Sequence, residues 1–332
     1  MSSLYADAIV VDGLEVANWS RDVFEDMHRA GITAANCTCC IWEGIEGAMT
    51  NVASFKRWLR ENDDIIRPVR SGSDIEAAKR EGRVGIILGW QNISGIEDKL
   101  YYLELFKELG VGIIQLAYNT QNFVGAGCYE SNDPGLSDFG REAVAELNRV
   151  GILIDLSHVG TATTRDAITC SQKPVVFSHT CPAALHPHPR NKTDEEMRRV
   201  AEGGGLVGVT LFSWFLRAGS QATLDDYIHA LEHTIDVAGE DHVGIGTDFT
   251  DGHPEPFFDH ILRDKGYARH LVAESATTVA ELALPRGISG IKDFPRIAEH
   301  LEAHGWPEGR IRKVLGENWC RVLGEVWGTA AA

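Results

Sequence analysis

The chain has 332 residues, of which 44% are hydrophobic and 24% charged, so it can bury a large core. Its 31 basic and 48 acidic side chains give a net charge of -17, which would repel phosphate backbones and anionic lipid headgroups. We therefore expect neither a nucleic-acid partner nor a membrane partner.

The first residues carry no basic flank followed by a long apolar stretch, and no later window holds about 18 uninterrupted apolar residues. Seven cysteines, an odd number, fit reduced thiols better than a disulfide framework. We accordingly expect a soluble, cytoplasmic protein. Cys37 and Cys40 form a CxxC pair around Cys39, but no second pair completes a tetrahedral zinc site. We interpret these cysteines as buried strand residues, with a redox or catalytic role as the alternative.

Short apolar and β-branched runs recur along the chain, and helical segments separate them. In chain order the runs cover residues 8–13, 34–41, 84–91, 112–119, 151–158, 174–180, 205–212 and 242–249. Because these runs are nearly continuous rather than alternating, they indicate strands covered on both faces, as in a parallel sheet wrapped by helices.

Helical periodicity predicts helices over residues 97–110, 137–151, 193–204, 223–239, 291–305 and 307–328. The first two place apolar residues three and four apart and end at a glycine suited to a C-terminal cap. A capping box from Thr193 to Glu196 begins the third helix, and Thr223 with two following acids begins the fourth. Strand and helix therefore alternate through most of the chain.

This alternation predicts an α/β fold, a (β/α)8 TIM barrel, with a doubly wound open sheet with extra strands as the alternative. No repeat, linker or low-complexity tract divides the chain. We therefore expect residues 1–332 to form a single barrel domain with C-terminal helices. A Pro- and aromatic-rich loop over residues 249–267 follows the last strand and leaves room for a homo-oligomer interface.

Polar side chains end several of the predicted strands, at the barrel face where active sites form. They are Gln91, Tyr118, Asn119, His158, His179 and Asp248. Two neutral imidazoles from consecutive strands can each give a nitrogen to one divalent metal, and a nearby carboxylate can complete the coordination or take a proton from water. A single histidine there would more often be a hydrogen-bonded core residue, but two at equivalent strand ends favour a metal site.

Arg190 lies in the loop that follows His179. Its planar guanidinium could hold a substrate carboxylate through two hydrogen bonds. A surface or capping arginine is the alternative, and the residues alone do not decide between the two.

The segments "LSHVG", "FSHT", "HPRNKTDEEM", "GLVGV" and "VGIGTDFTDG" together resemble the membrane (renal) dipeptidase family of zinc metallopeptidases, peptidase family M19. The stretches "DFGREAVAELNRVGILIDLSH" and "LGENWCRV" extend the resemblance over almost the whole chain. The resemblance implies an amidohydrolase-like (β/α)8 barrel with two zinc ions that cleaves small dipeptides, often with a D-residue at the C-terminal position. It also implies zinc ligation by His158 and His179, a site role for Asp248, and substrate-carboxylate binding by Arg190.

Three positions depart from the family pattern. Residues 12–16 read Asp-Gly-Leu-Glu-Val where the family has Asp-Gly-His-Asn-Asp, so both first-strand ligands of the first zinc are lacking. The family's bridging glutamate falls on Gln91, whose amide is neutral. Tyr118 stands where the family has a histidine thought to polarise the scissile carbonyl, although a phenol can still donate a hydrogen bond to an oxyanion.

These departures bear on the number of metals. Two zinc ions would need more negative charge than Asp248 and a neutral amide supply in a desolvated pocket. We therefore expect a single zinc, held by His158 and His179 with Gln91 or Asp248. Glu15 could serve as a metal ligand or as a base. However, successive side chains of a strand point to opposite faces, so Glu15 points away from the face that carries Leu14 and Val16.

The sequence thus predicts a dipeptidase-like metallohydrolase that cleaves an amide bond in a small carboxylate-bearing substrate. Asp248 and Tyr118 would be catalytic, and Arg190 and Asn119 would bind substrate. One alternative is the same barrel catalysing a lyase, isomerase or decarboxylase reaction on a small carboxylated metabolite, with the strand-end side chains as acids and bases. Another is a non-catalytic homologue that only retains a ligand.

Overall fold

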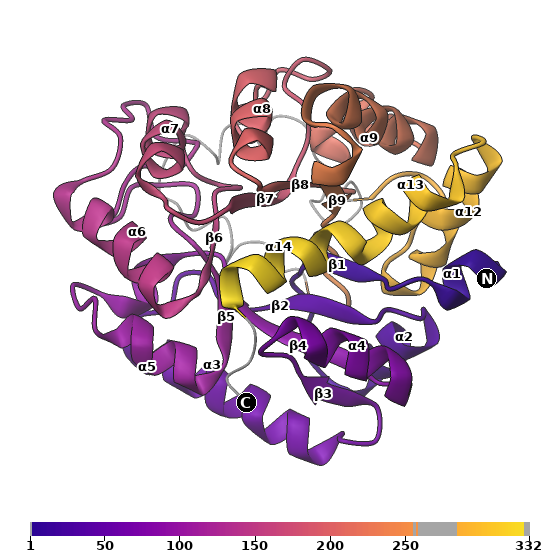
Figure 1. Cartoon of the computed structure of the whole chain (residues 1–332), viewed down its shortest axis with the longest axis horizontal. Helices are drawn as coiled ribbons and strands as arrows, with labels where there is room; N and C mark the ends of the chain where they lie inside the picture. The colour runs from indigo at the N-terminus through magenta and orange to yellow at the C-terminus, as the bar shows by residue number, and fades with distance from the viewer. Residues whose placement is uncertain (1, 255–256, 258–283, 329–332) are drawn as a thin grey trace.

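The computed structural model describes residues 2–254, 257 and 284–328. Its core is one parallel sheet in the order β1-β2-β4-β5-β6-β7-β8-β9, curved into a barrel, with β3 paired to β4 outside this order (Figure 1). The strands are β1 (Val11–Glu15), β2 (Ala34–Cys40), β3 (Ile66–Pro68), β4 (Val84–Trp90), β5 (Val111–Gln115), β6 (Leu153–Asp155), β7 (Val175–Thr180), β8 (Leu206–Val209) and β9 (Val243–Ile245).

Helices surround this sheet and alternate with its strands (Figure 1). They are α1 (Ser3–Asp7), α2 (Arg21–Arg29), α3 (Ile45–Glu61), α4 (Gly72–Glu81), α5 (Tyr102–Leu109), α6 (Asp138–Val150), α7 (Thr161–Cys170), α8 (Asp194–Glu202), α9 (Leu224–Ala238), α12 (Pro295–Ala303), α13 (Glu308–Arg312) and α14 (Asn318–Trp327). Among these described helices, none has both the length and the apolar character needed to cross a bilayer.

Backbone hydrogen bonds between the ends of β1 and β9 close the barrel. Glu15 forms a parallel bridge with Phe249, and the Val16 N–H donates to the Phe249 carbonyl at 2.9 Å. The Asp248 N–H donates to the Leu14 carbonyl at 3.0 Å. The barrel prediction is therefore confirmed, and the open-sheet alternative is wrong.

Most of the predicted elements lie where the sequence places them. Each of the predicted runs overlaps a barrel strand, and the Thr193–Glu196 capping box begins α8. The sequence missed β3, because three residues ending in a proline carry no strand pattern. The predicted helix over 307–328 is interrupted by a π-helical turn at Lys313–Glu317. The predicted aromatic loop lies mostly outside the described residues.

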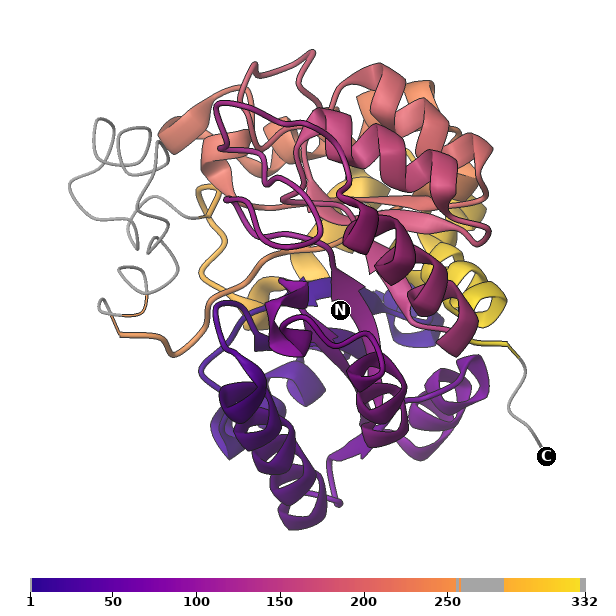
Figure 2. The same cartoon turned by 90° about the vertical axis from the view of Figure 1, so that its left-hand side faces the viewer.

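Helix α14 covers the N-terminal end of the barrel. Its buried Trp319 and Val322 pack with residues from the starts of the strands, including Val11 of β1 and Leu153 of β6. Figure 2 shows α14 on one side of the strands and the long connections that follow the strands on the other. The opposite, C-terminal end is therefore the end that is available for a site.

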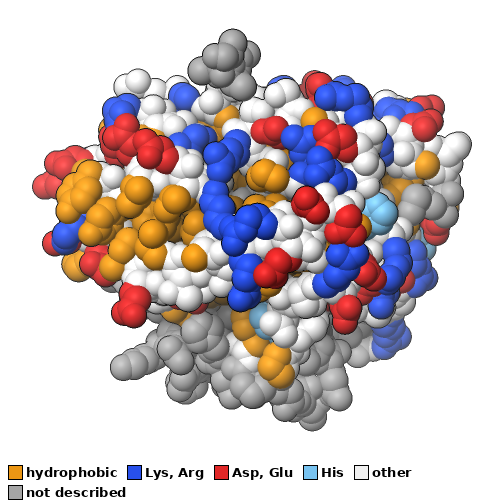
Figure 3. Space-filling view, turned by 90° about the horizontal axis from the view of Figure 1, so that it is seen from below, with side chains coloured by type: hydrophobic (Ala, Val, Ile, Leu, Met, Phe, Trp, Pro, Cys, Tyr) orange, Lys and Arg blue, Asp and Glu red, His pale blue; other side chains and the backbone are white. Residues whose placement is uncertain are grey.

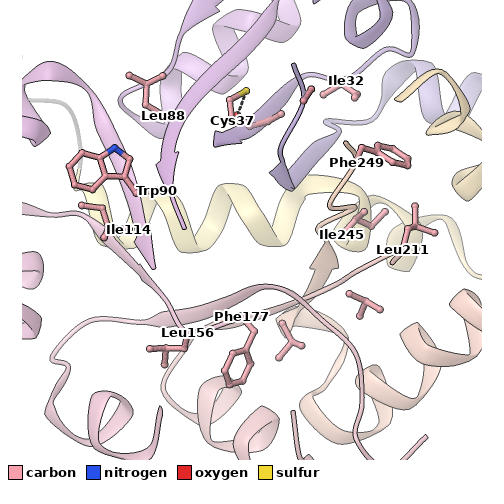
Figure 4. Close-up of a cluster of buried hydrophobic side chains, with 14 of the residues drawn as sticks. Ile32, Cys37, Leu88, Trp90, Ile114, Leu156, Phe177, Leu211, Ile245 and Phe249 are labelled. Carbon is pink, nitrogen blue, oxygen red and sulfur yellow. Dashed lines mark hydrogen bonds between the residues drawn. The ribbon is translucent and has the colours of Figure 1, made fainter. Parts of the chain in front are cut away.

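A larger apolar cluster fills the layer between the strands and the surrounding helices. Figure 4 shows part of it, with side chains from β2, β4, β5, β7 and β9. Cys37, Cys39 and Cys40 are buried, and all three are free thiols. The interpretation of these cysteines as buried strand residues is confirmed.

In Figure 3, apolar side chains gather on the left of the surface, and a band of lysine and arginine side chains crosses its middle. The large apolar side chains that the described surface exposes are Met49, Tyr101, Leu105 and Phe123. The net charge of -17 therefore coexists with local positive and apolar areas. The homo-oligomer remains a prediction.

Candidate metal centre

Two histidine side chains meet at the C-terminal end of the barrel. His158 lies just after β6, and His179 lies in the neighbouring β7. Both residues are buried, and their Nε2 atoms are 3.0 Å apart. The sequence predicted this convergence from the equivalent positions of the two residues on consecutive strands.

The other nitrogen of each ring is fixed by a hydrogen bond to a neighbouring side chain. His158 Nδ1 lies 2.7 Å from Asn119 Oδ1, and His179 Nδ1 lies 2.6 Å from Ser178 Oγ. Since Ser178 gives its own hydroxyl proton to the Asp155 carboxylate, the Ser178 oxygen accepts from His179. Both Nδ1 atoms therefore carry a proton, and both Nε2 lone pairs point toward the space between the rings.

Asp155 at the end of β6 organises this arrangement. Its carboxylate accepts from the Ser157 N–H at 3.0 Å and from the Ser178 N–H at 2.9 Å. It also accepts from the hydroxyl groups of both serines. The buried Asp155 carboxylate thus connects β6 to β7 and fixes the backbone and serine groups next to the two histidines.

This donor set fits a divalent metal. Two imidazole lone pairs at 3.0 Å repel each other unless a cation lies between them, and nitrogen ligands bind zinc at about 2.0–2.1 Å. Burial, and then the charge of Arg190, lower the pKa of both His158 and His179 well below the ordinary value, so both rings stay neutral. Orientation of a ligand histidine by a second hydrogen bond is the usual arrangement around a metal.

Asp248 follows β9 and lies at the same end of the barrel. It is partly buried and has a φ of 62°, an unfavourable backbone conformation for a residue other than glycine. Burial raises the pKa of Asp248 to about 6, with the Arg190 charge opposing this shift and the Asp155 charge adding to it. In the described part of the chain, no three His, Cys, Asp or Glu side chains are placed to hold one ion together. A third ligand would therefore have to move, or be an amide or a water molecule.

The other predicted site residues surround the histidines. The ring of Tyr118 stacks on His158 with centroids 4.1 Å apart, and Trp42 packs edge-on against Tyr118. Asn119, which holds His158, has a φ of 59°. Gln91 is buried after β4, where its Nε2 donates to Thr38 Oγ1 at 3.1 Å. Strained residues such as Asn119 and Asp248 often concentrate at functional sites.

Arg190 is fully buried and binds the backbone of both segments that carry the histidines. Its Nη1 donates to the Ser157 carbonyl and its Nη2 to the His179 carbonyl, both at 2.6 Å. The guanidinium also lies over the Phe215 ring, while its Nε has no partner among the described residues. The two Nη groups that would hold a substrate carboxylate therefore bind the backbone on either side of the site.

Lys192 is a second buried cation that the sequence did not single out. Its Nζ donates to the Val159 carbonyl at 2.5 Å and to Thr164 Oγ1 at 3.3 Å. Burial lowers the pKa of Lys192. In the sequence, only the position of Lys192 two residues after Arg190 could have pointed to a role at the site. A lysine in a polar loop is normally exposed, so this position did not stand out.

Glu15 lies apart from the histidines. It is fully buried, and neither carboxylate oxygen has a hydrogen-bond partner among the described residues. Burial, and then the charges of Asp12 and Asp251, raise the pKa of Glu15 well above its ordinary value. Burial also raises the pKa of Asp12 to about 7, although Thr247 donates to its carboxylate. Burial, and then the charges of Glu15 and Asp12, raise the pKa of Cys37. Glu15 is the register partner of Cys37, which belongs to the apolar layer outside the barrel.

Comparison with known proteins gives close matches. A crystal structure described as an amidohydrolase from Pseudomonas aeruginosa is 52% identical and covers 98% of both chains, with a TM-score of 0.93. A metallopeptidase from Rhodobacter sphaeroides, liganded with a phosphinate mimic of the dipeptide L-Ala-D-Ala, is 22% identical and covers 97% of this chain and 100% of its own, with a TM-score of 0.81. At that identity the likeness concerns the fold alone.

Sequence relatives point the same way. An uncharacterized dipeptidase of Schizosaccharomyces pombe is 37% identical over 187 residues, which are 54% of this chain and 45% of that protein. The match thus spans less than half of the length of that curated relative. The family model for membrane dipeptidase, peptidase family M19, matches residues 21–281. The chain therefore belongs to the membrane dipeptidase family, peptidase family M19.

Proposed function

We propose that the protein is a dipeptidase-like metallohydrolase that cleaves an amide bond in a small carboxylate-bearing substrate with one zinc ion. The observation that carries this proposal is the 3.0 Å separation of the His158 and His179 Nε2 atoms, whose Nδ1 atoms are both engaged elsewhere. When bound, zinc activates water and polarises a carbonyl group. Gln91 or Asp248 would complete its coordination.

The chain's own groups supply the remaining chemistry. Asp248 is assigned as the base that orients the attacking water and takes its proton, because it follows β9 at the same end of the barrel as the histidine pair and burial raises its pKa to about 6. Tyr118 is assigned as the hydrogen-bond donor to the oxyanion that forms at the scissile carbonyl. Its ring is positioned for this role by the stacking on His158 and the edge contact with Trp42.

Substrate orientation is assigned to Asn119 and Arg190. Asn119 already touches His158 and follows Tyr118 directly, so it lies where a substrate amide would bind. Arg190 is committed to two backbone carbonyls, so we expect it to attract the substrate carboxylate by its charge, together with Lys192, rather than by direct contact.

A metal assay coupled to hydrolysis tests the proposal. The protein is purified without chelator, its metal is measured by elemental analysis, and release of free amino acids from a dipeptide panel is followed before chelation, after chelation and after zinc is restored. We expect about one equivalent of zinc and activity that disappears and returns with it.

Two results would overturn the proposal. One is a metal content below about a tenth of an equivalent together with no gain of activity when zinc is added. The other is full activity of the chelated protein on a carboxylated metabolite, which would favour the lyase, isomerase or decarboxylase alternative.

A further inference from the structure

Two adjacent cysteines at the end of β2 share one pocket. Cys39 and Cys40 both line a cavity of about 170 Å³ between the ends of β1 and β2 and the helix α3, and we call it the dithiol pocket. The Cys40 side chain is hydrogen-bonded to the Cys39 side chain. The hydrolysis proposed above uses neither thiol.

A change of register in β2 explains why two consecutive side chains meet. Successive side chains of a regular strand point to opposite faces. In the pairing of β2 with β4, however, Thr38 lies opposite Gly89 and Cys40 opposite Trp90, so Cys39 is an additional residue in β2. A bulge of this kind re-aims a side chain. The two sulfurs are therefore neighbours in space as well as in sequence.

Hydrogen bonds to the backbone hold the two cysteines in this conformation. Asn51 Nδ2 of α3 donates to the Cys39 carbonyl at 2.7 Å. The Gln91 N–H, which follows β4, donates to the Cys40 carbonyl at 2.9 Å. A ligand that bonds to both sulfurs therefore finds them already together, which lowers the entropy cost of binding.

The surroundings of the sulfurs disfavour an ionic complex. Cys39 is 5% exposed and Cys40 is 2% exposed. Burial, then the contact with Cys39, and then the charge of Glu43, raise the pKa of Cys40 far above its ordinary value. In the described part of the chain, no three His, Cys, Asp or Glu side chains are placed to form a tetrahedral metal site. The pocket therefore favours a ligand that bonds to two sulfurs and leaves a neutral product.

The remaining walls of the dithiol pocket are mainly apolar. They include Val16, Trp19, Phe55 and Trp58. Cavities of about 150 Å³ with apolar walls hold benzene in other proteins. The pocket therefore has room for one group of about the size of a phenyl ring beside the two sulfurs.

We propose that the dithiol pocket is a covalent binding site for a trivalent arsenical that carries one organic group, R–As(OH)₂. Sulfur ligands prefer soft centres of this kind. Each of the two thiols forms one S–As bond as one As–O bond breaks, and the thiol proton leaves with the hydroxide as water. Arsenic stays trivalent, no oxidant is needed, and the product is neutral. The site is separate from the histidine pair and does not depend on the proposed function.

Titration of the reduced full chain with phenylarsine oxide, which water converts to the dihydroxy form, tests the proposal. We expect about one arsenic for each chain by elemental analysis and a change in tryptophan fluorescence, because Trp19 and Trp58 line the pocket. A small dithiol should remove the arsenic at concentrations at which a monothiol does not, because two S–As bonds hold it. A wild-type chain that binds no arsenic under these conditions would overturn the proposal.

Three alanine variants assign the two sulfurs. Cys39→Ala and Cys40→Ala each remove one S–As bond, so we expect affinity to fall about 100-fold or more and a monothiol to remove the arsenic. Cys37→Ala makes the same change in the same strand but outside the pocket lining, and should bind as the wild type does. Loss of binding in Cys37→Ala, or affinity within about 3-fold of the wild type in both pocket variants, would overturn the assignment.

A measurement on the wild-type protein serves if a pocket variant fails to fold. The arsenical complex is denatured and treated with iodoacetamide, and its peptides are mapped by mass spectrometry. We expect Cys39 and Cys40 to be the two thiols that escape alkylation. Protection of any other pair would overturn the proposal.

A matched pair of phenylalanine variants locates the organic group. Ser54→Phe adds a ring at a half-buried lining position of α3, and Ala53→Phe adds one at the exposed neighbouring position outside the lining. We expect Ser54→Phe to weaken binding of phenylarsine oxide about 10-fold and Ala53→Phe to leave it unchanged. Equal binding by both variants would contradict the placement of the phenyl group in the dithiol pocket.

Discussion

The guanidinium of Arg190 donates to the backbone carbonyl of His179 at 2.6 Å, so this buried cation binds directly to the strand that carries one of the two converging imidazoles. A second bond of the same length to the Ser157 carbonyl joins it to the segment that carries the other imidazole. Arg190 therefore acts as a brace between β6 and β7.

Replacing Arg190 tests this brace. Arg190→Met should weaken zinc binding about 10-fold or more and lower the free energy of unfolding by roughly 3–5 kcal/mol, because two buried carbonyls lose charged donors. Arg141→Met, in which the lost partner is the half-exposed Asp166, is the control and should cost less than about 1 kcal/mol. A variant that binds zinc normally and shows only a raised KM would instead identify Arg190 as a direct carboxylate ligand.

The hydrogen bond from His179 to Ser178 gives a second prediction. Ser178→Ala removes the acceptor that fixes His179 Nδ1, so we expect zinc affinity to fall about 10- to 100-fold, whereas His179→Ala should abolish stoichiometric binding. Competition with a chromophoric chelator measures both. Ser171→Ala, after α7 and away from the site, is the control. Equal zinc affinity of Ser178→Ala and the wild type would contradict the assigned tautomer.

The buried Glu15 predicts a pH dependence of stability. Folding raises the pKa of the Glu15 carboxyl group above its value in the unfolded chain, which is near 4.3. The free energy of unfolding therefore decreases as the pH rises from the unfolded pKa toward the folded pKa. Glu15→Gln should therefore gain stability relative to the wild type as the pH is raised from 5 to 8, by at most about 1.4 kcal/mol for each pH unit. Urea unfolding at the two pH values measures this difference.

The Glu15 experiment reports on Glu15 together with Asp12, because the Asp12 pKa is raised to about 7 and the charge of Asp12 raises the pKa of Glu15. Burying an amide in place of the acid costs the same at both pH values, and His158 and His179 act equally in both proteins. Folding lowers the pKa of both histidines below their pKa in the unfolded chain, which is about 6.5. They therefore reduce the stability of the fold only when the pH falls below that unfolded pKa. Glu46→Gln, on the exposed side of α3, should show no difference between pH 5 and pH 8. An identical stability change in Glu15→Gln at both pH values would mean that Glu15 stays ionised.

The departures that the sequence predicts from the family pattern can be reversed to test the single-metal prediction. The triple variant Leu14→His, Val16→Asp and Gln91→Glu adds one imidazole and two carboxylates, which supply ligands and negative charge for a second cation. We expect elemental analysis to show about two equivalents of zinc in the triple variant and about one in Gln91→Glu alone. A second equivalent in the wild-type protein would show that the missing ligands are dispensable.

The sequence allowed the barrel and the histidine pair to be predicted because both depend on local pattern. Near-continuous apolar runs report strands buried on both faces, and equivalent positions at the ends of β6 and β7 bring His158 and His179 together whatever the packing around them. The anchoring role of Asp155 and Ser157 in the "DLSH" segment was not predicted, although an aspartate and a serine at a buried strand end must find partners.

The direction of long side chains was not predictable in the same way. Arg190 and Lys192 follow a loop rich in proline and histidine, where an exposed position is the ordinary expectation, and only the tertiary structure turns both inward onto backbone carbonyls.

The position of α14 across the N-terminal end of the barrel has a consequence for biosynthesis. Val11 of β1 packs with Trp319 of α14, so this contact joins the first strand of the barrel to a helix that follows its last strand. A nascent chain cannot form the contact until α14 has been synthesised. The N-terminal end of the barrel therefore stays uncovered while the strands and the helices that precede α14 are being made.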